Sequence, residues 1–186
     1  MVKLPKNRPW KVLSSEYLLR EGAWCTVRRE SVQLPSGVVI PHWYIYEFPN
    51  WANIIAITKD EKIVLISQYR HGLGKTNYEL PAGLIDDSDA SPLEGAKREL
   101  EEETGYGGGD WSLLMTISPN PTNSTNLNYC FLAKGVELVA DRHPEDSEDI
   151  EVHLFTKSEV REILEQDGII QALHAAPLWR YFAEER

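Results

Sequence analysis

Two short apolar runs in the first half of the chain constrain its fold most strongly. Residues 52–58 contain the run IIAI and residues 62–69 contain the run IVLI, with a polar link at 59–61. Neither run alternates apolar with polar side chains, so each predicts a strand that is buried on both faces. Strands of this kind belong at the centre of a layered domain.

A helix is predicted for residues 92–104 by the signals at its two ends. Ser91 is a good N-cap, and Glu94 three residues later completes a capping box. Gly105 follows the last helical position, where glycine commonly ends a helix. The other expected elements are a hairpin over 24–48, strands at 113–118, 127–133 and 150–156, and helices at 157–166 and 169–184. This order predicts an α+β or three-layer domain.

The composition is that of an ordinary soluble globular protein. Of 186 residues, 42% are hydrophobic and 26% are charged, which excludes a mainly disordered or collagen-like chain. No apolar run approaches the ~20 residues of a membrane span, and the polar start MVKLPKNRPWK does not resemble a secretory signal. The only cysteines are Cys25 and Cys130, so we expect a reduced, cytoplasmic setting.

The net charge of −10 is concentrated in two segments. Residues 84–106 hold eight acidic and two basic side chains, and residues 141–151 hold six acidic and one basic. The rest of the chain is nearly neutral. A charge of this sign disfavours nucleic acid or an anionic membrane as a partner.

The helix 92–104 carries three carboxylates beside its apolar stripe. Glu99, Glu102 and Glu103 are neighbours on the helix surface, next to the stripe that includes Leu100. Arg98 lies one turn before Glu102 and can pair with it. Oxygen ligands alone favour a hard cation, Mg²⁺ or Mn²⁺. The five histidines show no ligand spacing, so each is expected to be a surface or satisfied core residue.

The segment GLIDDSDASPLEGAKRELEEETGY, residues 83–106, resembles the Nudix box. The first half departs from the pattern by one inserted residue, and Asp89 stands where the family has a glutamate. The insertion falls in a loop, where extra length costs little. The second half of the box is matched by Arg98, Glu99, Leu100, Glu102, Glu103, Gly105 and Tyr106.

The resemblance extends from Trp24 to the C-terminal helix. The segment QYRHGLGKTNYELPAGLIDD, the proline at 121 and the acidic segment EDSEDIEVH are similar to those of the ADP-ribose and ADP-sugar pyrophosphatases of this family. The resemblance implies a Nudix fold, in which mixed β-sheets lie between helices as an α/β/α sandwich. It also implies an N-terminal β-element over 1–50, for dimerisation and base binding, and a hydrolase domain over 51–186.

The activity implied by the resemblance is Mg²⁺-dependent hydrolysis of the diphosphate bond of nucleoside diphosphate sugars. ADP-ribose is the foremost substrate, and the products are a nucleoside monophosphate and a sugar phosphate. GDP-mannose or another nucleotide sugar is the alternative substrate. A Nudix-fold regulator that binds nucleotides without turnover is the alternative of another class, although decayed relatives usually lose the carboxylates that this chain keeps.

The same resemblance assigns roles to individual residues. The metal ligands would be the Ala82 carbonyl, Glu99, Glu102, Glu103 and Glu148, with Arg98 orienting the glutamates. Arg70 corresponds to a phosphate-binding arginine, and Glu79 to a position close to the substrate. The general base is open among Glu145, Asp146 and Glu148, of which Glu148 is favoured.

Two tryptophans of the N-terminal hairpin complete the implied site. In the family, aromatic residues at the places of Trp24 and Trp43 sandwich the nucleobase, and the two come from different subunits of a swapped homodimer. Residues 44–48 contain no arginine, although relatives often place one just after this tryptophan. That departure leaves room for nucleotide sugars other than ADP-ribose.

Overall fold

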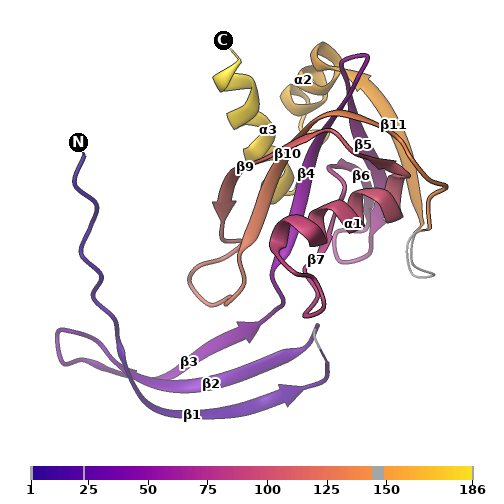
Figure 1. Cartoon of the computed structure of the whole chain (residues 1–186). Helices are drawn as coiled ribbons and strands as arrows, with labels where there is room; N and C mark the ends of the chain where they lie inside the picture. The colour runs from indigo at the N-terminus through magenta and orange to yellow at the C-terminus, as the bar shows by residue number, and fades with distance from the viewer. Residues whose placement is uncertain (1, 23, 144–148, 186) are drawn as a thin grey trace. The chain divides into compact units, whose positions relative to one another are not determined.

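The computed structural model describes residues 2–22, 24–143 and 149–185. The chain divides into two compact units (Figure 1). The first comprises Met1–Phe48 with the loop Asn120–Asn126, and the second comprises Pro49–Pro119 with Leu127–Arg186. None of the helices in the described part of the chain is long and apolar enough to cross a membrane.

The first unit is an antiparallel sheet in the order β1-β2-β3. Strands β2 (Thr26–Gln33) and β3 (Val39–Glu47) are the expected hairpin. Strand β1 (Lys11–Arg20) is an addition, because its sequence KVLSSEYLLR lacks the alternation that predicts a strand. All ten residues of β1 are exposed, so the strand depends on its backbone pairing with β2.

A loop from the second half of the chain completes this unit. The Tyr46 N–H donates to the Asn123 carbonyl at 2.7 Å, and the Thr125 N–H donates to the Tyr46 carbonyl at 3.1 Å. These bonds occupy the backbone of β3 next to Asn120–Asn126, the loop that contains the expected marker proline Pro121.

The second unit is built on a mixed sheet in the order β11-β5-β4-β10-β8. Its two central expected strands are β4 (Trp51–Thr58) and β5 (Lys62–Arg70), which pair antiparallel. Strand β10 (Asn128–Leu138) pairs with β4 in parallel and with β9 (Asp110–Ile117) antiparallel, and β11 (Ile150–Thr156) pairs with β5.

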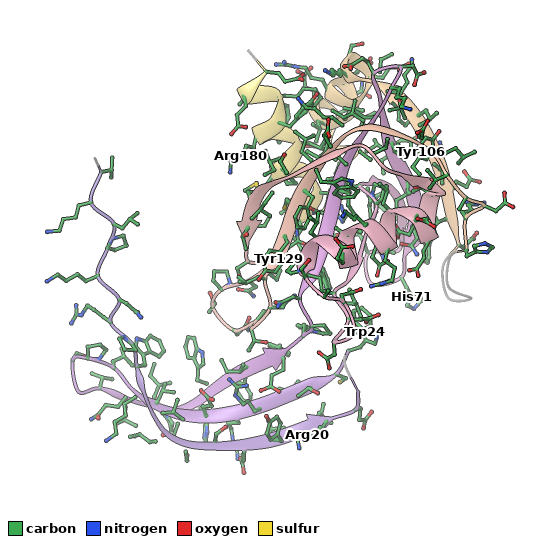
Figure 2. All side chains as sticks on the ribbon, viewed as in Figure 1. Arg20, Trp24, His71, Tyr106, Tyr129 and Arg180 are labelled. Atoms are coloured by element: carbon green, nitrogen blue, oxygen red, sulfur yellow. The ribbon has the colours of Figure 1, made fainter. Side chains whose placement is uncertain are left out.

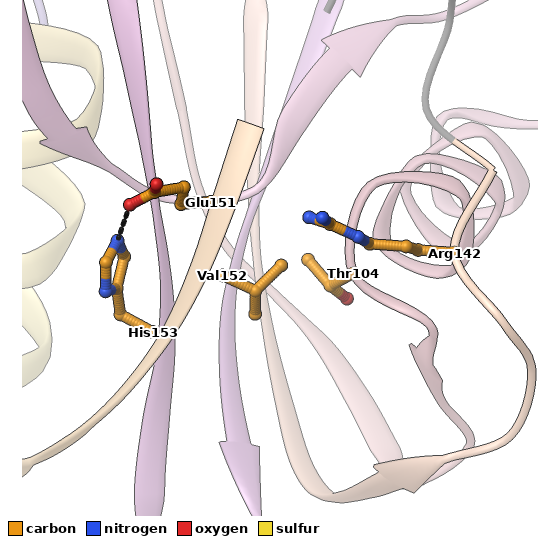
Figure 3. Close-up of a pocket in the computed structure, with 5 residues that line it drawn as sticks. All are labelled: Thr104, Arg142, Glu151, Val152 and His153. Carbon is orange, nitrogen blue, oxygen red and sulfur yellow. Dashed lines mark ion pairs between the residues drawn. The ribbon is translucent and has the colours of Figure 1, made fainter. Parts of the chain in front are cut away.

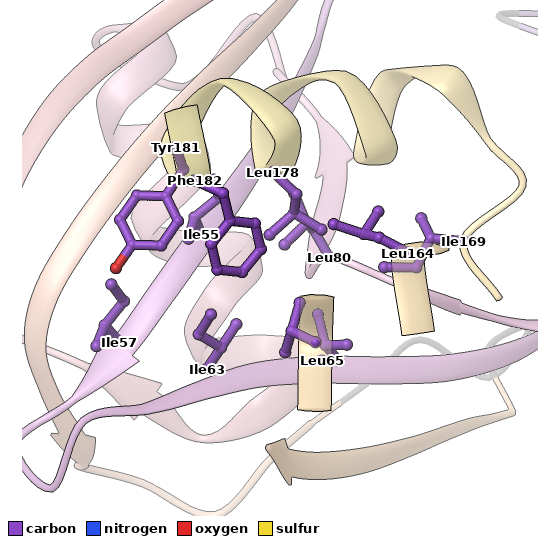
Figure 4. Close-up of a cluster of buried hydrophobic side chains, with 11 residues drawn as sticks. Ile55, Ile57, Ile63, Leu65, Leu80, Leu164, Ile169, Leu178, Tyr181 and Phe182 are labelled. Atoms are coloured by element: carbon purple, nitrogen blue, oxygen red, sulfur yellow. The ribbon is translucent and has the colours of Figure 1, made fainter. Parts of the chain in front are cut away.

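Helices cover both faces of this sheet (Figure 1). Helix α1 (Pro92–Thr104) packs with Ile54, Ala56 and Val64 on one face. Helices α2 (Lys157–Glu165) and α3 (Ala172–Glu184) pack on the other face against Ile55, Ile57 and Leu65, as Figure 4 shows. Successive residues of β4 and β5 thus alternate between two cores. The prediction of strands buried on both faces of an α+β domain is confirmed.

Three short strands were not expected from the sequence. Strands β6 (Lys75–Glu79) and β7 (Ala82–Leu84) pair with β5 and β4, and β8 (Tyr106–Gly107) pairs with β10. Each is too short to show a period. The last helix begins at Ala172 rather than at 169.

Candidate active site

Helix α1 presents two of its three clustered glutamates to the interior. Ser91 caps the helix by accepting the Glu94 N–H at 3.3 Å, but the Glu94 carboxylate accepts from Lys97. The capping box is therefore half formed. Gly105 ends the helix in the left-handed region, at φ 75°. Between these ends the predicted apolar stripe is buried, and Glu99 (9% exposed) and Glu103 (2% exposed) lie beside it.

Both buried carboxylates lie against the backbone of β7. The Ala82 N–H donates to Glu103 Oε2 at 2.9 Å. A β-carbon built on Gly83 would stand 2.1 Å from the carboxyl carbon of Glu99. The backbone of β7 therefore approaches the Glu99 carboxylate so closely that any side chain at Gly83 would displace it. The structure thus brings Ala82, Glu99 and Glu103 close together.

Arg98 donates hydrogen bonds to several of the neighbouring carboxylates. Its Nη1 donates to Glu99 Oε1 and to Glu102 Oε2, both at 2.8 Å, so the predicted pairing with Glu102 is present. Its Nη2 donates to the Leu84 carbonyl at 2.9 Å and to Asp89 Oδ2 at 3.1 Å. These neighbouring carboxylates raise the pKa of Arg98. The guanidinium links α1 to the strand and loop that precede it.

Asp89 is a structural partner of Arg98 whose role the sequence left undefined. Its side chain is 9% exposed and also accepts the Asp86 N–H at 2.8 Å. The hydrogen bonds from Arg98 hold the pKa of Asp89 below its ordinary value. Helical spacing does not reveal this contact, because Asp89 lies in the loop before the helix.

Arg70 and Glu79 form a second charged pair. The Arg70 Nε donates to Glu79 Oε1 at 2.9 Å, and Nη2 donates to Oε2 at 2.5 Å. Glu79 is buried, whereas the Arg70 side chain is 44% exposed. The pair joins the end of β5 to the end of β6, and it is a bidentate arrangement that fixes the plane of the guanidinium.

Trp24 and Trp43 lie in the N-terminal sheet unit. Trp24 follows the end of β1 and is 63% exposed (Figure 2). Trp43 is half-buried and packs edge-on against Trp10, with ring centroids 5.1 Å apart. Trp10 is an aromatic neighbour of Trp43 that the sequence did not single out.

The carboxylates of α1 suit a hard divalent cation. They offer only oxygen atoms as ligands. The Arg98 guanidinium contacts Glu99, Glu102 and Asp89, so negative charges outnumber the positive charge of Arg98 in this cluster. Among the described residues, no three Asp, Glu, His or Cys side chains converge as a metal-binding group. Glu99 and Glu103 by themselves are only two carboxylates and do not make up such a group. The expected residues Glu145, Asp146 and Glu148 lie outside the described residues.

A shallow hollow of about 400 Å³ lies near the C-terminal end of α1 (Figure 3). It is lined by Thr104, Arg142, Glu151, Val152 and His153. Arg142 Nη1 donates to the Ile150 carbonyl at 2.7 Å. Of the predicted site residues that the structure describes, none lines this hollow, and the buried carboxylates Glu99 and Glu103 belong to α1.

Two families of known domains match the sequence. Residues 49–174 match the NUDIX domain, and residues 10–46 match the nucleoside diphosphate sugar hydrolase N-terminal domain. The two matches together span most of the chain, and the boundary between them falls near the boundary between the two compact units.

Two relatives and one solved structure are similar over long stretches. The ADP-ribose pyrophosphatase of Mycobacterium tuberculosis is 33% identical over 141 residues, which are 75% of this chain and 67% of that protein. The ADP-sugar pyrophosphatase of Mus musculus is 28% identical over 87% of this chain and 81% of that one. A crystal structure of an ADP compounds hydrolase superposes with a TM-score of 0.82 at 22% identity, covering 97% of this chain and 96% of the other.

Proposed function

The chain belongs to the Nudix hydrolase family, and we propose that it hydrolyses the diphosphate bond of nucleoside diphosphate sugars, ADP-ribose foremost. The products would be a nucleoside monophosphate and a sugar phosphate. The N-terminal match to a nucleoside diphosphate sugar hydrolase domain supports the substrate class. The names of the mycobacterial and murine relatives support ADP-ribose or another ADP-sugar within that class.

The observation that carries this proposal is the buried pair Glu99 and Glu103 against β7. Glu99, Glu103 and the Ala82 carbonyl would hold Mg²⁺ or Mn²⁺, with Glu102 and Glu148 as further ligands. A divalent ion held by these residues would neutralise the charge of the diphosphate and activate the attacking water. Glu103 accepts the Ala82 N–H, and this bond keeps its carboxylate in place for that role.

Arg98 would orient the glutamates, because it donates to Glu99 and to Glu102 from one nitrogen. Arg70 would bind the diphosphate. Its planar guanidinium matches the geometry of phosphate oxygens, and Glu79 sets its orientation through two hydrogen bonds. Binding at a fixed orientation lowers the entropic cost of aligning the scissile bond.

Glu148 would be the general base, with Asp146 as the alternative. Both belong to the acidic segment EDSEDIEVH. A carboxylate at this place would accept the proton of the attacking water and so act as the general base.

The N-terminal sheet would serve dimerisation and base binding. In this proposal two copies exchange their N-terminal elements, and Trp24 and Trp43 stack on the two faces of the nucleobase. Stacking uses the ring face of a base without reading its edge, which suits several nucleotide sugars. A cytoplasmic setting is supported by Cys25 and Cys130, which are both free thiols.

A substrate panel tests the proposed function. ADP-ribose, GDP-mannose, ADP-glucose and UDP-glucose are offered at equal concentration with Mg²⁺, and the nucleoside monophosphate is quantified by chromatography. We expect ADP-ribose to give the highest kcat/KM and a chelator to abolish turnover. Faster turnover of GDP-mannose would reassign the substrate. Saturable binding without any hydrolysis would favour the nucleotide-binding regulator instead.

A further inference from the structure

His174 is a buried histidine directly behind the Arg70–Glu79 pair. It lies in the first turn of α3 and is 3% exposed, and Glu79 is 2% exposed. The His174 Nε2 is 3.7 Å from Glu79 Oε2. Arg70 and Glu79 both have a role in the proposed substrate binding, whereas His174 has none so far.

The other ring nitrogen defines the tautomer of His174. The Leu80 N–H donates to His174 Nδ1 at 3.2 Å, so Nδ1 carries no proton. Burial lowers the pKa of His174 to about 4, which keeps the ring neutral near pH 7. A neutral imidazole with an unprotonated Nδ1 carries its proton on Nε2. The Nε2–H therefore faces the buried carboxylate of Glu79.

A second polar contact fixes the turn that carries His174. The Asn53 Nδ2 donates to the Leu173 carbonyl at 2.6 Å, and Asn53 is completely buried. Asn53 pairs in register with Ala82, so the strand next to the proposed metal site also holds the start of α3. The position of His174 is thus determined from β4 and from the end of β6.

We propose that His174 is a positioning residue that holds Glu79, and through it Arg70, in the orientation that binds the substrate diphosphate. This inference rests on the proposed function for its kinetic consequences. Glu79 is held from both sides: Arg70 bonds both carboxylate oxygens, and the imidazole dipole faces Oε2 from the interior. Without His174, the carboxylate would lose the imidazole on its buried side, and the carboxylate could then turn together with the guanidinium that it binds.

Three variants separate the two contacts of His174. His174→Gln keeps an N–H donor at the reach of Nε2, and His174→Asn keeps an acceptor at the reach of Nδ1. His174→Leu keeps bulk and removes both. We expect the Leu and Asn variants to raise KM for ADP-ribose by ~10-fold, within the range of coupling between contacting residues. We expect the Gln variant to stay close to wild type, and kcat to change less than KM.

The pattern among the variants decides the proposal. A normal Asn variant with an impaired Gln variant would mean that His174 only supports the Leu80 backbone, and would overturn the proposal. An equal rise in KM in all three His174 variants, or no change of KM in any of them, would overturn the proposal as well. A double-mutant cycle with Glu79→Gln adds a second criterion: the Leu substitution should no longer change KM when Glu79 is already neutral.

Nitrogen NMR of the wild-type protein tests the inference without a substrate. We expect His174 to remain neutral at pH 6, with its proton on Nε2. A proton on Nδ1, or a charged ring at pH 6, would contradict the proposal. This measurement does not depend on turnover. If the protein hydrolysed none of the nucleotide sugars, the proposed function would be refuted, and the NMR spectrum would still test the tautomer of His174.

Discussion

The carboxylate of Glu99 lies against the α-carbon of Gly83. A β-carbon at Gly83 would stand 2.1 Å from Glu99 Cδ and 2.1 Å from Oε2, well inside any van der Waals contact. The contact joins helix α1 to strand β7, and it places a buried carboxylate next to the backbone that would supply the Ala82 carbonyl. Gly83 is thus a steric requirement for the position of Glu99.

We predict that Gly83→Ala impairs activity more than stability. The new methyl group displaces the end of a flexible side chain rather than backbone, so the fold can accommodate it. The displaced carboxylate, however, no longer occupies its ligand position, and a shift of about 1 Å can cost ~10²-fold in rate. Turnover of ADP-ribose and thermal unfolding are measured together.

Gly72→Ala is the matched control, because a β-carbon at Gly72 would have no heavy atom within 4 Å. It should leave both turnover and unfolding temperature near wild type. If Gly83→Ala also retains normal turnover, the position of Glu99 does not matter for the reaction.

Asp89→Asn should destabilise the protein in a pH-dependent way. Arg98 lowers the pKa of Asp89, so the folded state favours the ionised carboxylate more than the unfolded state does. This contribution is fully present well above the ordinary value of 3.8 and is lost as the pH falls through the lower folded value. We expect a loss of about 1–3 kcal/mol in unfolding free energy at pH 7.

Urea unfolding at pH 7 and at pH 3 measures this difference. The difference in unfolding free energy between wild type and Asp89→Asn should be smaller at pH 3 than at pH 7. Asp87→Asn changes an exposed residue of the same loop and should have little effect at either pH. A gap that is equal at both values would show that the charge of Asp89 does not stabilise the fold.

The central strands and α1 could be predicted because their signals are local. The runs in β4 and β5 and the end signals Ser91 and Gly105 specify an element without knowledge of its neighbours. Strand β1 could not be predicted, since it forms by pairing with β2 rather than by its own pattern. The contact between Asp89 and Arg98 has the same cause, because it depends on how a loop folds back over the helix.

The tautomer of His174 and its position beside Glu79 could not be predicted from the sequence either. The sequence predicted a surface or satisfied core residue, and His174 is buried and accepts the Leu80 N–H. The approach to Glu79 depends on the packing of α3 against the end of β6, and no pattern over neighbouring positions encodes it.

Trp24→Ala and Trp43→Ala should each raise KM for ADP-ribose by ~10-fold and change kcat less, since stacking contributes about 0.5–1.5 kcal/mol. Trp43 also packs against Trp10. Trp10→Ala therefore serves as a control that removes the contact between the Trp10 and Trp43 rings and keeps both proposed stacking residues.

Size-exclusion chromatography should show a homodimer. A monomer, or an unchanged KM in both variants, would refute the proposed role of the N-terminal sheet.

Glu148→Gln should reduce turnover while metal binding, measured by calorimetry with Mn²⁺, stays largely intact, because Glu99 and Glu103 would remain as the principal ligands. Asp146→Asn should reduce turnover less. The reverse order would assign the general base to Asp146. If both variants were as active as wild type, proton removal would rest on the glutamates of α1.

The central claim is that the buried carboxylate of Glu103 takes part in metal-dependent hydrolysis. The most direct measurement is the turnover of ADP-ribose with Mg²⁺ by Glu103→Gln, beside Glu101→Gln as an exposed control on the same helix. Glutamine keeps an acceptor for the Ala82 N–H and removes the charge. We predict a fall of at least ~10²-fold for Glu103→Gln, the scale of lost electrostatic stabilisation, and little change for the control. Wild-type turnover in Glu103→Gln would contradict the account.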